Sequence, residues 1–199
     1  MTANPPIIVG ITGASGAPYA VRLLQQLAAS HRPVSLIVSK YGLRLLGTES
    51  GIGSMEALRE SVGRAAWDAC VETFSNDDRG APPASGSSLT AGMIVCPCSM
   101  GTLSAIAVGA SRSLIERAAD VTLKERRRLI LVPRETPLSA IHLGNMLRLT
   151  RAGAVIMPAA PGFYHRPKQV SDLVDFVVAR MLDQLGVEQT LVKRWEGDA

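Results

Sequence analysis

The sequence predicts an α/β fold built on a doubly wound parallel sheet, in a single domain with a C-terminal tail. Short apolar runs with β-branched residues alternate with amphipathic helical patterns, which is typical of parallel βαβ units. The length of 199 residues fits one domain. Only 19% of the residues are charged and 47% are hydrophobic, whereas ordinary domains carry about 25% charged residues. Much apolar surface must therefore be buried within the chain or against other subunits.

The predicted elements follow one another in a regular order. The strands are short apolar runs, of which Ile7 to Ile11 is the first, and we expect them at residues 7–11, 34–38, 71–74, 93–96, 129–132 and 154–157. The helices carry apolar residues at helical spacing, and we expect them at residues 17–29, 40–48, 54–69, 101–110, 113–126, 138–150 and 170–185. The main loop, 76–88, is rich in Gly, Pro, Ser and Asp. We expect one domain over 1–185 and a tail over 186–199.

Composition and charge disfavour several classes of protein. No apolar run reaches the ~18 residues of a membrane span, and no basic segment precedes the first apolar stretch as in a signal peptide. The three cysteines, Cys70, Cys96 and Cys98, lack metal-site spacing and read as small buried residues in a reducing cytoplasm. The net charge of +4 owes much to the run Lys124–Arg128, which lacks interleaved aromatic residues. We therefore expect a cytoplasmic protein that binds no nucleic acid, no membrane and no metal.

Two segments at predicted strand ends have the composition of anion sites. Residues Thr12 to Gly16 join the first strand to the first helix, and residues Cys98 to Thr102 follow the fourth strand. Glycines let backbone N–H groups approach an anion, and helix N-termini favour negative charge. The dinucleotide motif GxGxxG and the P-loop ending GK[ST] are both absent. The second strand ends in Ser39-Lys40, without the acid that would bind the ribose of NAD. A mononucleotide phosphate therefore fits better than NAD. Plain tight turns and helix caps remain the alternatives.

Charged side chains at other positions could also bind an anion. Arg117 and Lys124 lie seven residues apart on one predicted helix, although Asp120 and Lys124 could instead form an ordinary i,i+4 pair. Arg134 and Glu135 follow the fifth strand in a ligand-facing position, and Tyr164 lies in a segment at a strand end. Arg180 lies on the long apolar last helix, where an arginine usually extends its charge into solvent. No histidine has a Ser or Cys partner by spacing, so a nucleophilic triad is not indicated. These residues predict an anionic cofactor or substrate, and they leave the reaction open.

Six ordered blocks carry a resemblance to a known family. They are GITGASGAPYA at 10–20, APPASGS at 81–87, CPCSMGTLSAIA at 96–107, LIERAADVTLKERR at 114–127, LVPRETPLSAIHL at 131–143 and PAAPGFYHRP at 158–167. Together they resemble the UbiX-type flavin prenyltransferases over nearly the whole chain.

The resemblance implies a Rossmann-like subunit of a cytoplasmic homododecamer whose active sites lie at subunit junctions. The family transfers a dimethylallyl group from dimethylallyl monophosphate to N5 and C6 of reduced FMN, without a metal. The product, prenylated FMN, serves a UbiD-type decarboxylase, with a link to ubiquinone biosynthesis. The resemblance thus implies FMN as cofactor and prenyl acceptor, and the decarboxylase as partner.

Site residues follow from the resemblance position by position. The residues expected to contact FMN are Gly13, Ala14, Ser15, Ser39, Ser99, Met100, Gly101, Thr102 and Arg134. Those expected at the prenyl phosphate are Arg117, Lys124, Glu135, Tyr164 and Arg180. Those expected to act in catalysis are Ser15, Glu49, Arg117, Lys124 and Glu135. Trp195 in the tail is expected to cover the site.

Two other functions compete with this one. An FMN-dependent cysteine decarboxylase would share the fold and the flavin, but its Pro-x-Met-Asn-x-x-Met-Trp signature is missing around Asn145-Met146. A non-catalytic flavin carrier would not need the cluster of charged and phenolic groups expected at the phosphate. The sequence therefore favours the prenyltransferase.

Overall fold

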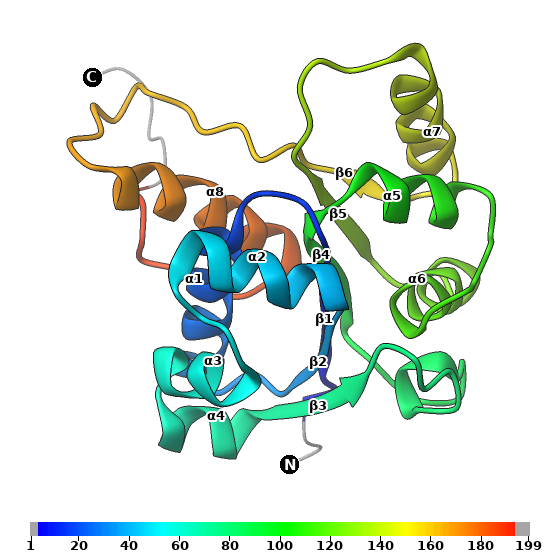
Figure 1. Ribbon diagram of the computed structural model, residues 1–199, viewed down its shortest axis with the longest axis horizontal. Helices are drawn as coiled ribbons and strands as arrows, with labels where there is room; N and C mark the ends of the chain where they lie inside the picture. Colours follow the sequence, from blue (N-terminus) through cyan, green and yellow to red (C-terminus); the bar gives the residue numbers. More distant parts are fainter. Residues whose placement is uncertain (1–3, 194–199) are drawn as a thin grey trace.

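A computed structural model of the chain describes residues 4–193. Six parallel strands form one sheet in the order β3-β2-β1-β4-β5-β6 (Figure 1). The strands are β1 Ile7–Ile11, β2 Val34–Val38, β3 Val71–Ser75, β4 Gly92–Cys98, β5 Leu129–Pro133 and β6 Val155–Ile156. The helices are α1 Ala17–Ala29, α2 Lys40–Ser50, α3 Met55–Val62, α4 Arg64–Cys70, α5 Met100–Ala107, α6 Leu114–Lys124, α7 Ala140–Arg151 and α8 Val170–Leu185. The predicted doubly wound parallel sheet is confirmed.

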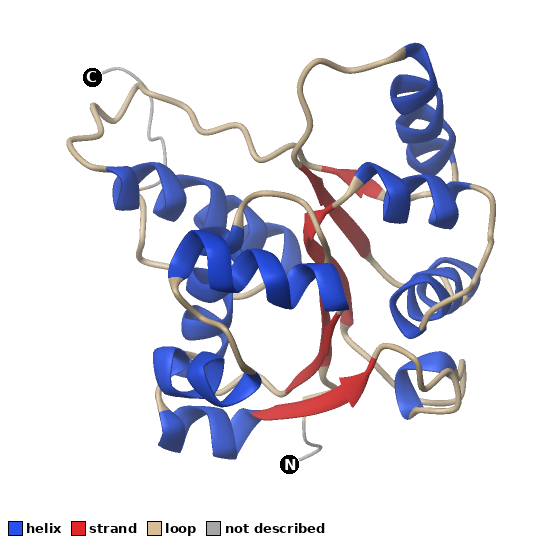
Figure 2. Cartoon of the chain, viewed as in Figure 1, coloured by secondary structure: helices blue, strands red, loops and turns tan. Residues whose placement is uncertain are grey.

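Helices cover both faces of the sheet (Figure 2). On one face, Val9 of β1 and Ile94 of β4 pack with α1 and α8, where Leu23 and Val178 are fully buried. On the other face, Ile8 and its neighbours pack with α5 and α6. Because successive strand residues point to opposite faces, strands buried on both sides read as unbroken apolar runs. That is the pattern from which they were predicted.

The element boundaries differ from the prediction where glycine adopts positive φ. The single helix expected over 54–69 is two helices, α3 and α4, because Gly63 between them has φ 105°. The helix expected over 101–110 ends at Ala107, shortly before Gly109 at φ 66°. Glycine meets no Cβ penalty in this region and ends a helix readily.

The central strands are fully buried and the edges are not. Every residue of β1, β4 and β5 is buried, while β3 at one edge is mostly exposed. Within residues 4–193, no helix is long and apolar enough to cross a membrane. The helix α7 buries only Leu149 and leaves Ile141 and Leu147 exposed. A folded protein usually covers such a face with another surface.

Candidate functional site

The strand order reverses between β1 and β4, which are neighbours at the centre of the sheet. In doubly wound sheets ligands bind at the carboxyl edge beside this switch point. Thr12 joins the two strand ends there. Its buried hydroxyl donates to the Pro97 carbonyl at 2.8 Å and accepts from the Ser99 N–H at 2.8 Å. Sequence reasoning missed this role of Thr12, because a partner 85 residues away in the chain leaves no local pattern.

The turn after β1 is compact enough to require glycine. A Cβ on Gly13 would lie 2.6 Å from the Cβ of Tyr41, the second residue of α2. Gly16 has φ 128°, in the region that favours glycine. This turn therefore packs Gly13 against the start of α2, and the other expected FMN residues, Ala14 and Ser15, follow it at the same edge.

The N-terminus of α1 holds the carboxylate of Glu49. The N–H groups of Gly16 and Ala17 both donate to Oε2 of Glu49 at 2.8 Å. Partial burial alone would raise the pKa of Glu49, but these two bonds, the Ser15 hydroxyl and the nearby Arg134 charge together hold it below its ordinary value. Glu49 is therefore ionised at neutral pH and already occupies the anion site at this helix terminus.

The N-termini of α2 and α5 offer further donors at the same edge. Ser39 caps α2 by accepting from the Gly42 N–H at 3.0 Å, and Ser99 caps α5 by accepting from the Thr102 N–H at 3.3 Å. In the part of the chain that the structure describes, the N–H groups of Lys40 and Tyr41 in α2 and of Met100 and Gly101 in α5 have no hydrogen-bond acceptor. A Cβ on Gly101 would meet nothing within 4 Å. These donors and hydroxyls fit the phosphate and the polar edge of a flavin mononucleotide.

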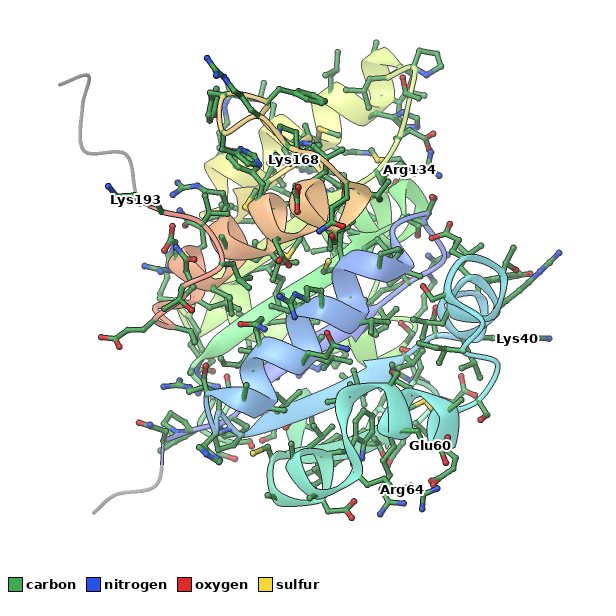
Figure 3. All side chains as sticks on the ribbon, turned by 90° about the vertical axis from the view of Figure 1, so that its left-hand side faces the viewer. Lys40, Glu60, Arg64, Arg134, Lys168 and Lys193 are labelled. Carbon is green, nitrogen blue, oxygen red and sulfur yellow. The ribbon has the colours of Figure 1, made fainter. Side chains whose placement is uncertain are left out.

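Arg134 and Glu135 follow β5 and are exposed. Figure 3 shows Arg134 on the opposite part of the molecule from Glu60 and Arg64. The Arg134 charge acts on Glu49, as its effect on that pKa shows. The Glu135 carboxylate accepts from the Thr136 N–H at 3.2 Å. Both residues therefore border the strand-end edge, as the sequence predicted.

The cations of α6 are paired with carboxylates. Arg117 donates to Asp120 at 2.8 Å, and Lys124 donates to Glu125 at 2.6 Å. The ordinary i,i+4 pair of Asp120 with Lys124 is therefore not formed. The side chain of Lys124 remains 49% exposed, so an anion can reach it.

Tyr164 and Arg180 lie apart from the cations of α6. Arg180 is on α8, which covers the opposite face of the sheet from α6 (Figure 1). Its side chain is 57% exposed and pairs with Asp183 at 2.8 Å. Tyr164 is 76% exposed and its ring packs edge-on against Phe176 of α8 at 5.7 Å. The residues expected at the prenyl phosphate therefore do not meet within one chain, and Trp195 lies outside the described residues.

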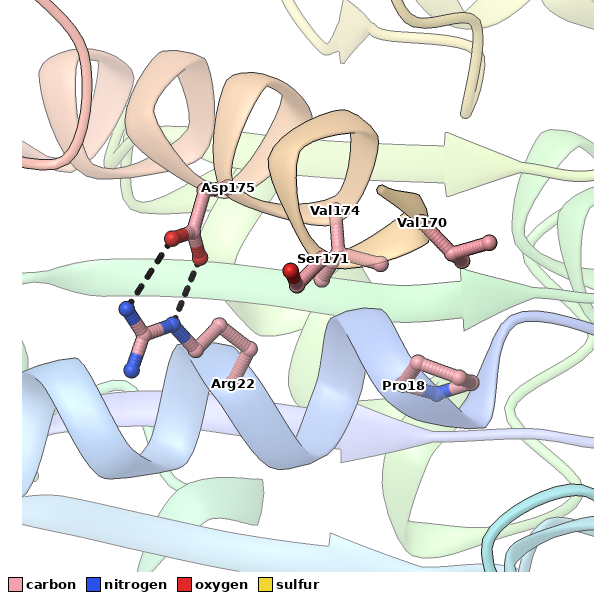
Figure 4. Close-up of a pocket in the computed structure, with 6 residues that line it drawn as sticks. All are labelled: Pro18, Arg22, Val170, Ser171, Val174 and Asp175. Carbon is pink, nitrogen blue, oxygen red and sulfur yellow. Dashed lines mark hydrogen bonds and ion pairs between the residues drawn. The ribbon is translucent and has the colours of Figure 1, made fainter. Parts of the chain in front are cut away.

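Two grooves flank α8. One of ≈ 530 Å³ lies between α1 and α8 and is bridged by Arg22, whose Nε donates to Asp175 Oδ1 at 2.6 Å and whose Nη2 donates to Oδ2 at 3.1 Å (Figure 4). The other, of ≈ 360 Å³, lies beside Lys168 and Lys193. Neither contains the residues expected to hold FMN.

The cysteines and acids of the described residues do not gather into a metal site. Cys96 and Cys98 are fully buried in β4, and burial raises the pKa of Cys98 to about 12. Both are therefore thiols that fill space, as expected. Among residues 4–193, no group of three His, Cys, Asp or Glu residues could hold a metal ion.

Comparison with known proteins agrees with this geometry. The flavoprotein family model matches residues 1–182. The flavin prenyltransferase UbiX of Pseudomonas aeruginosa is 52% identical over 98% of this chain and 96% of the relative. That of Methanocaldococcus jannaschii is 48% identical over 95% of this chain and 97% of the relative.

Solved structures extend the comparison. AnUbiX (PadA1), in complex with FMN and dimethylallyl pyrophosphate, superposes with a TM-score of 0.90 at 42% identity, over 98% of this chain and 100% of that chain. A dodecameric FMN-dependent Ubix-like decarboxylase from Escherichia coli O157:H7 gives 0.88 at 44% identity, over 96% and 100%. The cysteine decarboxylase TvaF gives 0.60 at 14% identity, over 92% of this chain and 98% of that chain, which shows the fold alone. The chain belongs to the flavoprotein family and, within it, to the UbiX-type flavin prenyltransferases.

Proposed function

We propose that the chain transfers a dimethylallyl group from dimethylallyl monophosphate to N5 and C6 of reduced FMN, forming prenylated FMN. The observation that carries this proposal is the 52% identity to a flavin prenyltransferase over 98% of the chain. The donors at the carboxyl edge of the sheet support it independently, since they fit a flavin mononucleotide. Reduced FMN supplies the nucleophilic atoms, and the residues of the chain bind, orient and manage charge.

FMN is held at the strand ends in this proposal. Its phosphate takes the open N–H groups at the start of α2 or α5, because Glu49 already fills the start of α1. The hydroxyls of Ser39, Ser99 and Thr102 and the guanidinium of Arg134 add donors at the same edge. The Glu49 carboxylate accepts from the Ser15 hydroxyl and thereby fixes its direction. In this proposal Ser15, held by that contact, acts near the reacting centre.

The prenyl phosphate is held by cations in this proposal. Departure of the phosphate develops negative charge, and preorganised donors in a water-excluded site stabilise such charge by about 3 kcal/mol each. Lys124 and Arg117 serve this purpose from α6, and Tyr164 and Arg180 serve it from the other face. Ring closure would add a proton to the prenyl double bond and remove one from C6, so that proton uptake and release balance; the departed phosphate would carry this proton while Glu135 positions it.

Oligomerisation completes the site in this proposal. Two of the expected phosphate residues lie on α6, and Tyr164 and Arg180 lie with α8 across the sheet, so copies of the chain must combine them. The exposed apolar side chains of Ile141 and Leu147 on α7 supply surface for such contacts. The dodecamer described for the Escherichia coli relative has the same fold at 44% identity. We therefore propose a homododecamer with sites at subunit junctions.

The remaining assignments follow the family. The product goes to a UbiD-type decarboxylase, in ubiquinone biosynthesis, and the enzyme works in the cytoplasm. Residues 1–185 form the catalytic domain, and the tail 186–199 covers the site with Trp195. Transfer without a metal is part of the same proposal.

The test measures the mass of the flavin. The purified protein is given FMN, reduced anaerobically and mixed with dimethylallyl monophosphate, and the flavin is then released and weighed by mass spectrometry. We expect the flavin mass to rise by one dimethylallyl group. An unchanged flavin refutes the proposal, and release of CO₂ from a peptide with a C-terminal cysteine would favour the decarboxylase instead.

A further inference from the structure

The loop between β3 and β4 is fastened to α6 at both ends of that helix. At the N-terminal end, the Leu114 N–H donates to the Asn76 carbonyl at 2.7 Å, and the Ile115 N–H donates to the Asn76 side-chain oxygen at 3.1 Å. Asn76 thus supplies acceptors for two of the N–H groups that a helix start leaves unpaired. The loop leaves β3 already attached to α6.

At the C-terminal end, Arg127 forms hydrogen bonds with the same loop. Its Nη2 donates to the Gly86 carbonyl at 2.7 Å, and its Nη1 donates to the Ser88 carbonyl at 2.7 Å and the Thr90 hydroxyl at 3.3 Å. Arg127 can reach back because the chain reverses at Arg126, which has φ 57°. A planar guanidinium with five donors suits this three-point contact, which a lysine cannot reproduce.

Gly86 lies directly against the ion pair at the end of α6. A Cβ on Gly86 would lie 2.2 Å from the Glu125 carboxylate and 2.9 Å from the Lys124 ammonium. No side chain fits there unless that pair moves. The position of residues 86–90, which Arg127 sets, therefore limits where Lys124 and Glu125 can go.

The charges around Lys124 fit the same arrangement. The hydrogen bond from Lys124 holds the pKa of Glu125 below its ordinary value, and the Arg127 charge adds to that effect. Glu125 is therefore ionised at neutral pH, and its carboxylate is bonded to the Lys124 ammonium at 2.6 Å. It orients the Lys124 ammonium while that group stays 49% exposed to an incoming anion.

We propose that Arg127 is a positioning residue for prenyl transfer. By holding Gly86 to Thr90 against the end of α6, it keeps the Lys124 ammonium in the place that the departing phosphate requires. The proposal rests on the role of Lys124 in the function proposed above. The hydrogen bonds of Arg127 go to the loop, and the proposal gives it no contact with the flavin or the phosphate.

The first experiment measures Lys124 without any flavin chemistry. The protein is acylated at lysines with N-acetoxysuccinimide, and the rate at Lys124 is followed by peptide mass spectrometry. We expect Arg127→Ala to raise this rate several-fold. Residues 86–90 would then no longer be held against the end of α6, and the Lys124 side chain would be more accessible to the reagent. Arg64→Ala is the control, since it also removes a bonded arginine side chain, one on α4 that pairs with Glu60, away from α6. An unchanged rate in Arg127→Ala overturns the proposal.

The second experiment measures prenyl transfer by variants in a double-mutant cycle. We expect Arg127→Ala to lower kcat about ten- to a hundredfold, the cost of a displacement near 1 Å, with FMN affinity unchanged. Arg127→Lys should recover only part of the loss, and Gly86→Ala should lower kcat by displacing the pair. In a Lys124→Ala background, Arg127→Ala should have no further effect.

The outcomes separate this proposal from the one on which it rests. If the wild-type protein forms no prenylated flavin, the proposed function fails and this inference fails with it. If the wild-type protein is active and Arg127→Ala keeps its full rate, only the positioning role is wrong. A loss that adds in full to that of Lys124→Ala also refutes it, because Arg127 would then act independently of Lys124.

Discussion

Glu49→Gln tests the interpretation of the α1 terminus. The change keeps a carbonyl oxygen that can accept from Gly16 and Ala17, whose N–H groups now donate to Oε2 at 2.8 Å. It removes the charge that faces the helix dipole and Arg134. An anion at a helix N-terminus contributes 0.3–1 kcal/mol, and hydrogen bonds to a charged acceptor are roughly twice as strong as neutral ones. Because Glu49 is exposed in the single chain, we expect the loss to total about 1 kcal/mol.

The assay is thermal and urea unfolding at one fixed protein concentration. A loss of about 1 kcal/mol lowers Tm by roughly 2–4 °C in a chain of this size. Glu60→Gln is the control, because Glu60 makes a surface i,i+4 pair with Arg64, and such pairs contribute about 0.3–0.5 kcal/mol.

The pH dependence of the difference gives a second check. The folded protein holds the pKa of Glu49 below its ordinary value, so the carboxylate stabilises the fold above the unfolded pKa of about 4.3. That contribution is lost as pH falls through the lower, folded pKa. The gap between wild type and Glu49→Gln should be full at pH 7 and close in acid. A variant as stable as wild type at pH 7, or a gap that persists in acid, refutes the reasoning.

The remaining predictions concern ligands and assembly. Gly13→Val should purify with little FMN, since even a Cβ there lies 2.6 Å from Tyr41; a full flavin spectrum contradicts this. Glu135→Gln should keep FMN but slow transfer, and an unchanged rate removes Glu135 from the mechanism. Lys124→Ala should lower turnover about a hundredfold. EDTA should leave the wild-type rate unchanged, and a rate that EDTA abolishes and Mg²⁺ restores would overturn the metal-free reaction. The wild-type protein should prefer the monophosphate over the diphosphate as prenyl donor. Mixing Arg180→Ala subunits with Gly13→Val subunits should restore some activity if subunits exchange, whereas a fully active monomer excludes a shared site.

The sequence predicted the fold well because its information there is local. An apolar strand such as Ile7–Ile11 and a helix such as Ala17–Ala29 depend on residue types that lie next to one another, and both have the predicted bounds. The break at Gly63 was missed because a glycine inside a helical pattern is compatible with either continuation or termination. Its φ of 105° depends on how α3 and α4 pack, which short-range pattern does not encode.

The site was less predictable because its contacts join distant segments. Glu49 meets Gly16 across 33 residues, and Arg127 meets Gly86 across 41. The sequence identified Glu49 only through the resemblance, and it placed Arg127 only within the basic run Lys124–Arg128. The sequence also did not determine which cation of α6 pairs with Asp120. Lys124 was one possible partner, but the structure pairs Asp120 with Arg117.

The division of the phosphate residues between two faces has a physical origin. In a doubly wound sheet, helices on opposite faces are separated by the sheet itself, so Lys124 on α6 and Arg180 on α8 cannot approach each other within one chain. A second copy can bring its own Arg180 to the α6 side of the first. The same contact would cover exposed apolar residues such as Tyr164, which is 76% exposed here. Burial of that surface and completion of the phosphate site would then be one event, so that loss of assembly and loss of turnover should occur together.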